Sequence, residues 1–156
     1  MNAFKILFNS IVVLIILMAI FFFGFTDSYR LSLKAKMKYM TSEYEEARVL
    51  AKEAFDLDPY NRMAISILSQ SKISAQMADY VKDAQSYMKN IEKLSARDDF
   101  LHSDKIKIKV YCEVMIGRYK KLNPTVLTDK ALFASCTKHY QQFKKIYEEL
   151  FPSTVR

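Results

Sequence analysis

The chain has 156 residues, of which 51% are hydrophobic and 26% are charged, and its formal net charge is +7. This length accommodates one membrane anchor and one domain of modest size, and the composition argues against intrinsic disorder. Only 2 glycines and 3 prolines occur, which disfavours strands joined by tight turns. The Lys and Arg residues are scattered along the chain, so the positive charge does not predict nucleic-acid binding.

The most apolar segment runs from Ile6 to Phe25 and contains no charged residue. A helix of about 20 apolar residues crosses a hydrocarbon core of roughly 30 Å. The run is longer than the apolar core of a secretory signal peptide, about 7–15 residues, and no small-residue cleavage site precedes Thr26. Residues 1–27 are therefore expected to form a retained single-pass transmembrane helix, with a cleaved signal as the alternative.

Two polar side chains, Asn9 and Ser10, interrupt this run. They are expected to lie near the lipid headgroups. Alternatively, Asn9 forms a hydrogen bond with a neighbouring transmembrane helix, because polar groups in lipid seek partners.

Basic residues follow the apolar run, at Arg30, Lys34, Lys36 and Lys38, whereas Lys5 alone precedes it. Because loops rich in Lys and Arg stay on the cytoplasmic side, this bias favours a cytoplasmic domain, with a periplasmic domain as the alternative. The four residues after the run are also expected at the membrane surface, where anionic lipid attracts them.

The stretch from Thr41 to Asn61 is the first clear helical landmark. Ala47, Ala51 and Ala54 recur at helical spacing, so they share one face against which a second helix can pack closely. Pro59 ends this helix, because proline cannot continue the backbone hydrogen bonds.

This stretch resembles a tetratricopeptide (TPR) repeat, a pair of helices of about 34 residues with small residues in each helix and a closing proline. The matching positions are Tyr44, Ala47, Ala54 and Pro59, with Ala35 as the small residue of the first helix. The stretch departs from the TPR pattern at three positions. No Trp opens the repeat, Lys38 stands where the family usually has an aromatic residue, and Ala51 stands where it usually has an aromatic or large apolar residue. The resemblance implies an all-α stack of helix hairpins after the transmembrane helix.

A weaker second copy follows. Leu68 and Ser69 match the first helix of a repeat, and Ala84, Met88, Ile91 and Leu94 repeat the spacing of the first copy. The two copies align only with extra residues in a turn near residues 76–79. Residues 28–96 are therefore expected to form two TPR-like helix pairs.

Residues 97–156 are expected to form a final helix hairpin that packs on the repeats, with helices over 102–122 and 128–150. The turn contains Pro124, and Thr128 or Asp129 is suited to cap the second helix. Residues 106–110 alternate like a strand, but a lone strand would have no partner, so a helix is expected there too.

Cys112 and Cys136 are equally distant from Pro124 and lie on the inward faces of this hairpin. Two buried free thiols are the favoured interpretation. A disulfide is the alternative, and it would indicate an oxidising compartment. Together with His139 they supply at most three metal ligands, one fewer than a structural zinc needs, so no metal site is expected.

These features together favour a membrane-anchored adaptor or assembly chaperone that binds and stabilises another membrane protein. In the TPR family the first helix of each repeat lines a concave binding face. By that resemblance, together with Asn9 in the membrane, the expected partner-binding residues are Lys36, Tyr39, Ser66, Gln70 and Ile73.

The alternative is a permanent structural subunit of a membrane-embedded machine. The chain is similar in general character to small single-pass accessory proteins of bacterial flagellar motors, including helpers of the stator units. That similarity implies a bacterial inner membrane and a motor or stator component as partner. The sequence shows no polar constellation of the kind that catalysis requires, so neither an enzyme, a cofactor nor a small-molecule substrate is expected.

Overall fold

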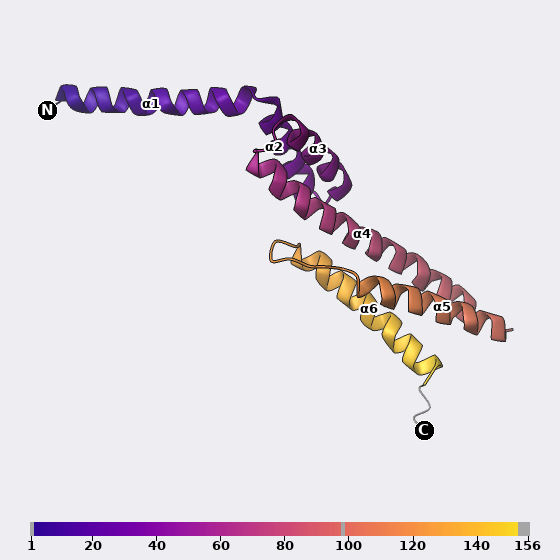
Figure 1. Cartoon of the computed structure of the whole chain (residues 1–156). Coiled ribbons are helices and arrows are strands. Elements are labelled where there is room, and N and C mark those ends of the chain that lie inside the picture. The colour runs from indigo at the N-terminus through magenta and orange to yellow at the C-terminus, as the bar shows by residue number, and fades with distance from the viewer. Residues whose placement is uncertain (1, 98, 153–156) are drawn as a thin grey trace. The chain divides into compact units, whose positions relative to one another are not determined.

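Every regular element in the described part of the chain is a helix, so the expected all-α class is confirmed (Figure 1). The computed structural model describes residues 2–97 and 99–152. Its helices are α1 (Asn2–Phe25), α2 (Asp27–Met40), α3 (Tyr44–Leu57), α4 (Arg62–Ser95), α5 (His102–Tyr119) and α6 (Lys130–Leu150). They form two compact units, residues 1–72 and 73–156, and the boundary falls within α4.

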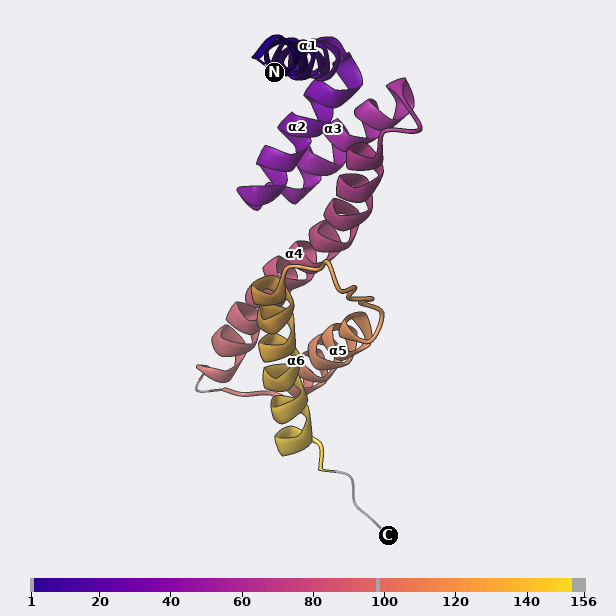
Figure 2. The same ribbon diagram turned by 90° about the vertical axis from the view of Figure 1, so that its left-hand side faces the viewer.

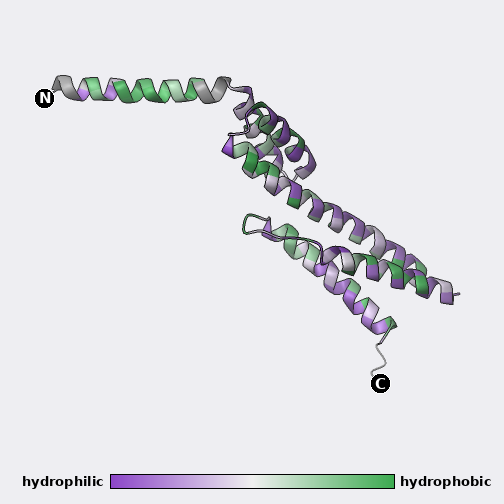
Figure 3. Ribbon diagram, viewed as in Figure 1, coloured by the Kyte–Doolittle hydropathy of each residue, from purple (hydrophilic) through white to green (hydrophobic). Residues whose placement is uncertain are grey.

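The first helix, α1, is continuous, and its described side chains are mostly apolar (Figure 3). The large apolar side chains between Leu7 and Phe21 are exposed by 38 to 67%. Within the described residues, no helix combines the length and the apolar character needed to cross a membrane. The side chains of Ile6 and of residues 22–25 complete the apolar run in the sequence and lie outside the described part. The described residues therefore do not support the anchor expected over residues 1–27.

Small side chains hold α2 and α3 together, and the two helices lie side by side (Figure 2). Ala35 of α2 is fully buried, as are Ala47, Ala51 and Ala54 of α3. The predicted alanine face is therefore confirmed. Ile67, from the first half of α4, completes this small core.

The helix α3 ends where the sequence predicts. Leu57 is its last residue, and the Asp58 backbone N–H donates to the Ala54 carbonyl. Pro59 follows, and the Asp58 carboxylate accepts the Tyr60 backbone N–H over 2.9 Å. At the other end, Ser42 has a φ of 65°, a left-handed conformation that lets the chain reverse between α2 and α3.

A buried polar junction lies where α4 meets α2. The Asn61 carbonyl oxygen Oδ1 caps α4 by accepting the backbone N–H groups of residues 63 and 64 over 3.0 and 3.2 Å. Its amide Nδ2 donates to the hydroxyls of Ser28 and Ser32 over 2.8 and 2.9 Å. Ser28 in turn donates to the Ala54 carbonyl over 2.7 Å. All three polar side chains are at most 2% exposed, so one amide joins α2 to the start of α4.

The second helix pair expected within residues 62–96 is wrong, because α4 is one helix from Arg62 to Ser95 without a turn at residues 76–79. Those four residues include neither proline nor glycine, so nothing in them breaks a helix. A continuous helix also places Met77, Tyr80 and Ala84 on one face, and all three are at most 1% exposed. The structure therefore contains one short helix pair, α2 and α3, followed by a long helix.

The second unit has its own core, formed by the second half of α4 with α5 and α6. The buried side chains are Met77, Tyr80, Ala84 and Ile91 of α4, Ile108, Cys112 and Met115 of α5, and Cys136 and Phe143 of α6. The two predicted C-terminal helices are present as α5 and α6, and the helical interpretation of residues 106–110 is confirmed. They pack on the second half of α4, and the expected packing on the repeats stays a prediction. Asp129 caps α6 by accepting the Ala131 and Leu132 backbone N–H groups, as one of the two predicted capping residues.

Candidate functional site

A mostly apolar groove lies on the α2–α3 pair, and we name it the hairpin groove. Its volume is about 280 Å³, and its lining residues are Lys34, Met37, Lys38, Thr41, Glu43 and Leu50. A second hollow of about 300 Å³ adjoins it at Leu50 and is also lined by Glu45, Glu46 and Val49. Met37 is 63% exposed and Val49 is 45% exposed, so apolar surface is open to solvent along both hollows.

Ion pairs fix the end of the hairpin groove near the α2–α3 turn. The Lys38 ammonium lies 2.5 Å from a Glu43 carboxylate oxygen and 2.8 Å from one of Glu46. The Thr41 hydroxyl also donates to Glu43, over 2.7 Å. Hydrogen bonds to Glu43 and Glu46 raise the pKa of Lys38, and the Lys38 hydrogen bond lowers the pKa of Glu43. The Lys38 ammonium therefore neutralises the carboxylates of Glu43 and Glu46 and is not free to bind an external anion.

The other three basic residues predicted for the membrane surface, unlike Lys38, do not pair with Glu43 or Glu46. Lys34 and Lys36 are exposed, and neither forms an ion pair within the described residues. Arg30 is exposed and lies 3.6 Å from Asp27 in a solvent-accessible pair, which is worth little. Three of the four predicted cations thus remain available to an anionic surface, whereas Lys38 is engaged within the protein.

The residues predicted to bind a partner differ in their exposure and in the contacts that they form. Lys36 is exposed, whereas Tyr39 is half-buried and packs edge-on against Tyr44 with ring centroids 5.3 Å apart. Gln70 donates to Ser66 over 2.9 Å on the first half of α4. Ile73 packs against the core of the second unit, so its apolar side chain is already partly covered.

Asn9 lies on a face of α1 that also carries Ser10, Val13, Leu14 and Leu17. Asn9 is exposed. The spacing of these residues places them along one side of the helix. The structure thus leaves the Asn9 amide accessible from one side of α1.

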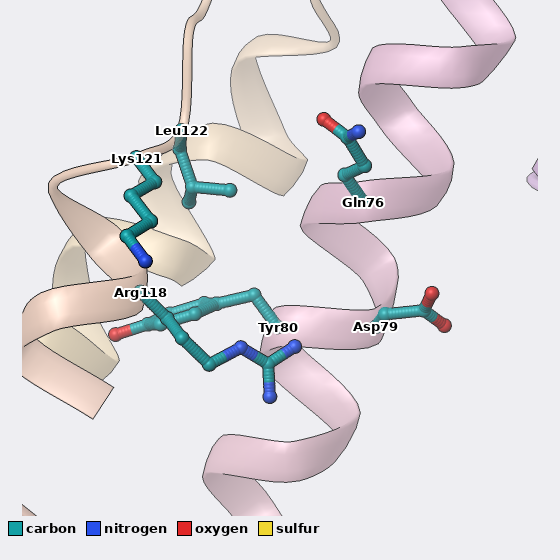
Figure 4. Close-up of a pocket in the computed structure, with 6 residues that line it drawn as sticks. All are labelled: Gln76, Asp79, Tyr80, Arg118, Lys121 and Leu122. Atoms are coloured by element: carbon teal, nitrogen blue, oxygen red, sulfur yellow. The ribbon is translucent and has the colours of Figure 1, made fainter. Parts of the chain in front are cut away.

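A pocket of about 260 Å³ in the second unit lies between α4 and the end of α5 (Figure 4). It is lined by Gln76, Asp79 and Tyr80 from α4 and by Arg118, Lys121 and Leu122. Arg118 forms an ion pair with Asp83 of α4, and both Arg118 and Lys121 lie at the end of α5, where cations offset the helix dipole. The Arg118–Asp83 ion pair thus joins α5 to α4.

Tyr80 forms the floor of this pocket and carries a buried hydroxyl. The side chain is 1% exposed, and its Oη has no hydrogen-bond partner among the described residues. Burial raises the pKa of Tyr80, because the charged phenolate is poorly solvated there. A hydroxyl without a partner costs stability, so Tyr80 serves packing rather than hydrogen bonding.

Both cysteines are buried free thiols, so the predicted alternative of a Cys112–Cys136 disulfide is not formed. Burial raises the pKa of each thiol to about 11, which keeps both protonated and unreactive. The Cys136 thiol donates to the Met77 carbonyl over 3.6 Å. His139 pairs with Gln142 of its own helix over 3.0 Å. The described side chains include no group of three or more His, Cys, Asp or Glu placed to hold a metal ion.

The junction of Asn61 with Ser28 and Ser32 was missed by the sequence interpretation. The available signals were local: an asparagine directly before a helical pattern, two positions after a proline, is typical of a helix N-cap. Ser28 and Ser32 also share a face of α2 with Ala35, as residues three and four positions apart do. Their hydrogen bonds to an amide far along the chain have no sequence signature.

Comparison with known proteins gives no relative: no family model, no curated protein and no solved structure matches this chain.

Proposed function

We propose that the protein is a membrane-anchored helical adaptor whose hairpin groove binds the juxtamembrane segment of another membrane protein. The observation that carries this proposal is the apolar hairpin groove, which lies on the helix that follows α1 after the single residue Thr26. An adaptor attached in this way searches for its partner in the plane of the bilayer. The groove would meet the part of that partner nearest the lipid.

Two features support the anchor. The sequence from Ile6 to Phe25 is a charge-free run of 20 residues, which at 1.5 Å per residue matches a hydrocarbon core of roughly 30 Å. The helix α1 extends without a break from Asn2 to Phe25, so the whole run belongs to one helix. Leaving the apolar side chains of such a helix in water would cost free energy. Exposed apolar patches of this size therefore mark interaction or membrane surfaces.

The groove fits an amphipathic helix better than it fits a small molecule. It is open, apolar along Met37 and Leu50, and continuous with the hollow at Val49. A partner helix would insert large apolar side chains at a spacing of three and four residues. Lys34 at the groove margin forms no ion pair within the described residues, so an acidic residue on the partner would give the complex charge complementarity.

The need for a covering partner follows from the single helix pair. Repeat proteins bury a continuous core by stacking about three or more units, and here α2 and α3 are followed only by the first half of α4 within their unit.

Membership of the TPR family is part of this proposal, supported by the positions of Tyr44, Ala47, Ala54 and Pro59. The similarity to flagellar-motor accessory proteins receives no added support from the described residues.

A charge placed beside the groove tests the proposal. Val49→Glu puts a carboxylate on an exposed apolar site of the hollow that adjoins the groove at Leu50, and Tyr60→Glu, at a site that is 90% exposed and outside both hollows, is the matched control. We expect the Val49 variant to fold normally. When it is purified from solubilised membranes, the amount of partner recovered with it should fall at least tenfold, because burying an unpaired charge costs free energy. Equal recovery with both variants would contradict the groove as the binding site.

A further inference from the structure

We propose that α2 lies against the surface of an anionic bilayer, with the apolar side chains of Leu33, Met37 and Met40 at the lipid interface. We name these three residues the outer stripe. This inference rests on the proposed anchor at α1 and assigns a second membrane contact to the folded part of the chain. The two contacts would hold the hairpin groove at a fixed height above the lipid.

The outer stripe is apolar and open. Leu33, Met37 and Met40 are exposed by 56, 63 and 75%, although α2 is a short helix in a folded unit. Their spacing of four and three residues aligns them on one side of the helix. A stripe of large apolar side chains left in water is unfavourable, so a covering surface would stabilise this face.

The opposite face of α2 is already occupied by the protein. Ser28, Ser32 and Ala35 are at most 2% exposed and pack toward α3 and the start of α4. The helix α2 therefore has two apolar or small-residue faces, of which only the inner one is covered within its unit. The outer stripe plays no part in that packing and is free to contact something else.

Charge identifies the covering surface. At about 100° per residue, Arg30 and Lys34 lie on one side of the outer stripe and Lys36 lies on the other. Asp27 is the only acidic residue of α2, so cations border the stripe on both sides. This arrangement is typical of interfacial helices, whose apolar side chains enter the acyl boundary while Lys and Arg reach the phosphates.

The connection to α1 makes the contact easy to form. Only Thr26 separates the end of α1 at Phe25 from the start of α2 at Asp27. A helix that begins one residue after a membrane span starts within the headgroup region, where each nearby cation strengthens the attachment to anionic lipid by about fivefold. Met37 belongs to both the outer stripe and the hairpin groove, whereas the Leu50 wall of the groove lies on α3, which carries no residue of the stripe.

Tryptophan fluorescence tests this inference, because the natural chain contains no Trp. Single Leu33→Trp and Met40→Trp variants of the full chain are placed in phosphatidylcholine vesicles with and without an equal part of phosphatidylglycerol. We expect emission to shift to shorter wavelength, and lipids brominated near the headgroup to quench it. Both effects should be stronger when phosphatidylglycerol is present. Tyr60→Trp, on an exposed site away from the stripe, should show neither effect.

A variant in α1 separates failure of this inference from failure of the anchor. The fluorescence of the Ile15→Trp variant should be quenched by lipids brominated deep in the acyl chain. If this fluorescence is quenched but that of the Leu33→Trp and Met40→Trp variants is not, the surface contact would be overturned and the anchor would stand. Absence of quenching at Ile15→Trp would overturn both.

The charge dependence has its own control. Lys36→Glu in the Met40→Trp background should lower the quenching in anionic vesicles severalfold, whereas Lys36→Arg should preserve it. Lys72→Glu, an exposed site on α4, should have no effect. Quenching that is equal in neutral and anionic vesicles, or insensitive to Lys36→Glu, would overturn the role of the basic residues.

Discussion

The Asn61 amide donates a hydrogen bond to the Ser28 hydroxyl over 2.8 Å, although the two residues are 33 positions apart in the chain. Through this bond and its counterpart to Ser32, the helix that follows α1 is joined to the helix that leads into the second unit. Buried hydrogen bonds of this kind are costly to break, because the separated groups lose water as well as each other. The position of α2, and with it the hairpin groove, therefore depends on Asn61.

Replacing Asn61 by Ala should lower the free energy of unfolding by about 2–4 kcal/mol, from the lost helix cap and from serine hydroxyls that lose their donor. Urea unfolding of the full chain in detergent, followed by circular dichroism, measures the change. Tyr60→Ala, beside it but 90% exposed, should change stability by less than about 0.5 kcal/mol. Equal effects of the two substitutions would show that the junction contributes nothing.

Ser42 is held at a φ of 65° in the α2–α3 turn, a conformation that costs an L-residue about 1–2 kcal/mol. Glycine adopts it freely, so Ser42→Gly should raise the free energy of unfolding by about 0.5–1 kcal/mol after its greater unfolded-state entropy is subtracted. Ser42→Ala is the control and should give no gain, because alanine has the same backbone restriction. A loss of stability on Ser42→Gly would indicate that the hydroxyl contact with Tyr44 matters more.

Tyr80→Phe should leave the free energy of unfolding unchanged or raise it by up to about 1 kcal/mol, because the substitution removes a buried hydroxyl that has no partner among the described residues. The aromatic ring and its packing against Tyr119 are retained. Thermal unfolding measures the change. A drop of more than about 1 kcal/mol would mean that the Tyr80 hydroxyl does form a hydrogen bond in the folded protein.

Asp104 gives the second unit a predictable response to acid. Its side chain is buried at the start of α5, and the hydrogen bond from Lys107 lowers the pKa of its carboxyl group. Because the folded-state pKa lies below the unfolded value of about 3.9, the carboxylate stabilises the fold above that pH and loses this contribution as pH falls through the folded-state pKa. Asp104→Asn should weaken the loss of stability in acid. An unchanged acid response in the Asp104 variant would contradict the lowered pKa.

The two cysteines should not react with thiol reagents in the folded protein. Burial raises both pKa values to about 11, so at pH 8 the reactive thiolate is scarce and the sulfur atoms are enclosed. Denaturation without reductant should release two reactive thiols per chain. Thiols that appear only after reduction would show a Cys112–Cys136 disulfide and would place the domain in an oxidising compartment.

Periodicity and breaking residues allowed a correct prediction of the helical class, the end of α3 before Pro59 and the two C-terminal helices. These features depend on neighbours within a few residues, which the sequence displays directly. The break predicted at residues 76–79 was wrong, because alignment to a repeat does not create a turn where the chain carries no proline or glycine. The continuous helix is instead favoured by the burial of Met77 and Tyr80 in one core.

The candidate site was less predictable than the fold. Lys38 was grouped with the membrane-facing cations, but its pairing with Glu43 and Glu46 depends on how the turn brings α3 against α2. Exposure likewise separates Met37, which lines the hairpin groove, from Ala35, which is fully buried two positions earlier. Such distinctions require the packed helices, because the residue types alone are compatible with either environment.

Site-specific photocrosslinking in intact membranes tests the central claim most directly. A photoreactive amino acid replaces Leu50, which lines both the hairpin groove and the adjoining hollow, or, as the control, Tyr60 outside them, and crosslinked peptides are identified by mass spectrometry. The adaptor proposal predicts that the Leu50 position alone gives one dominant adduct, with a protein segment that adjoins a transmembrane span. Adducts that are equal at both positions, or that fall on soluble proteins or distant domains, would contradict it.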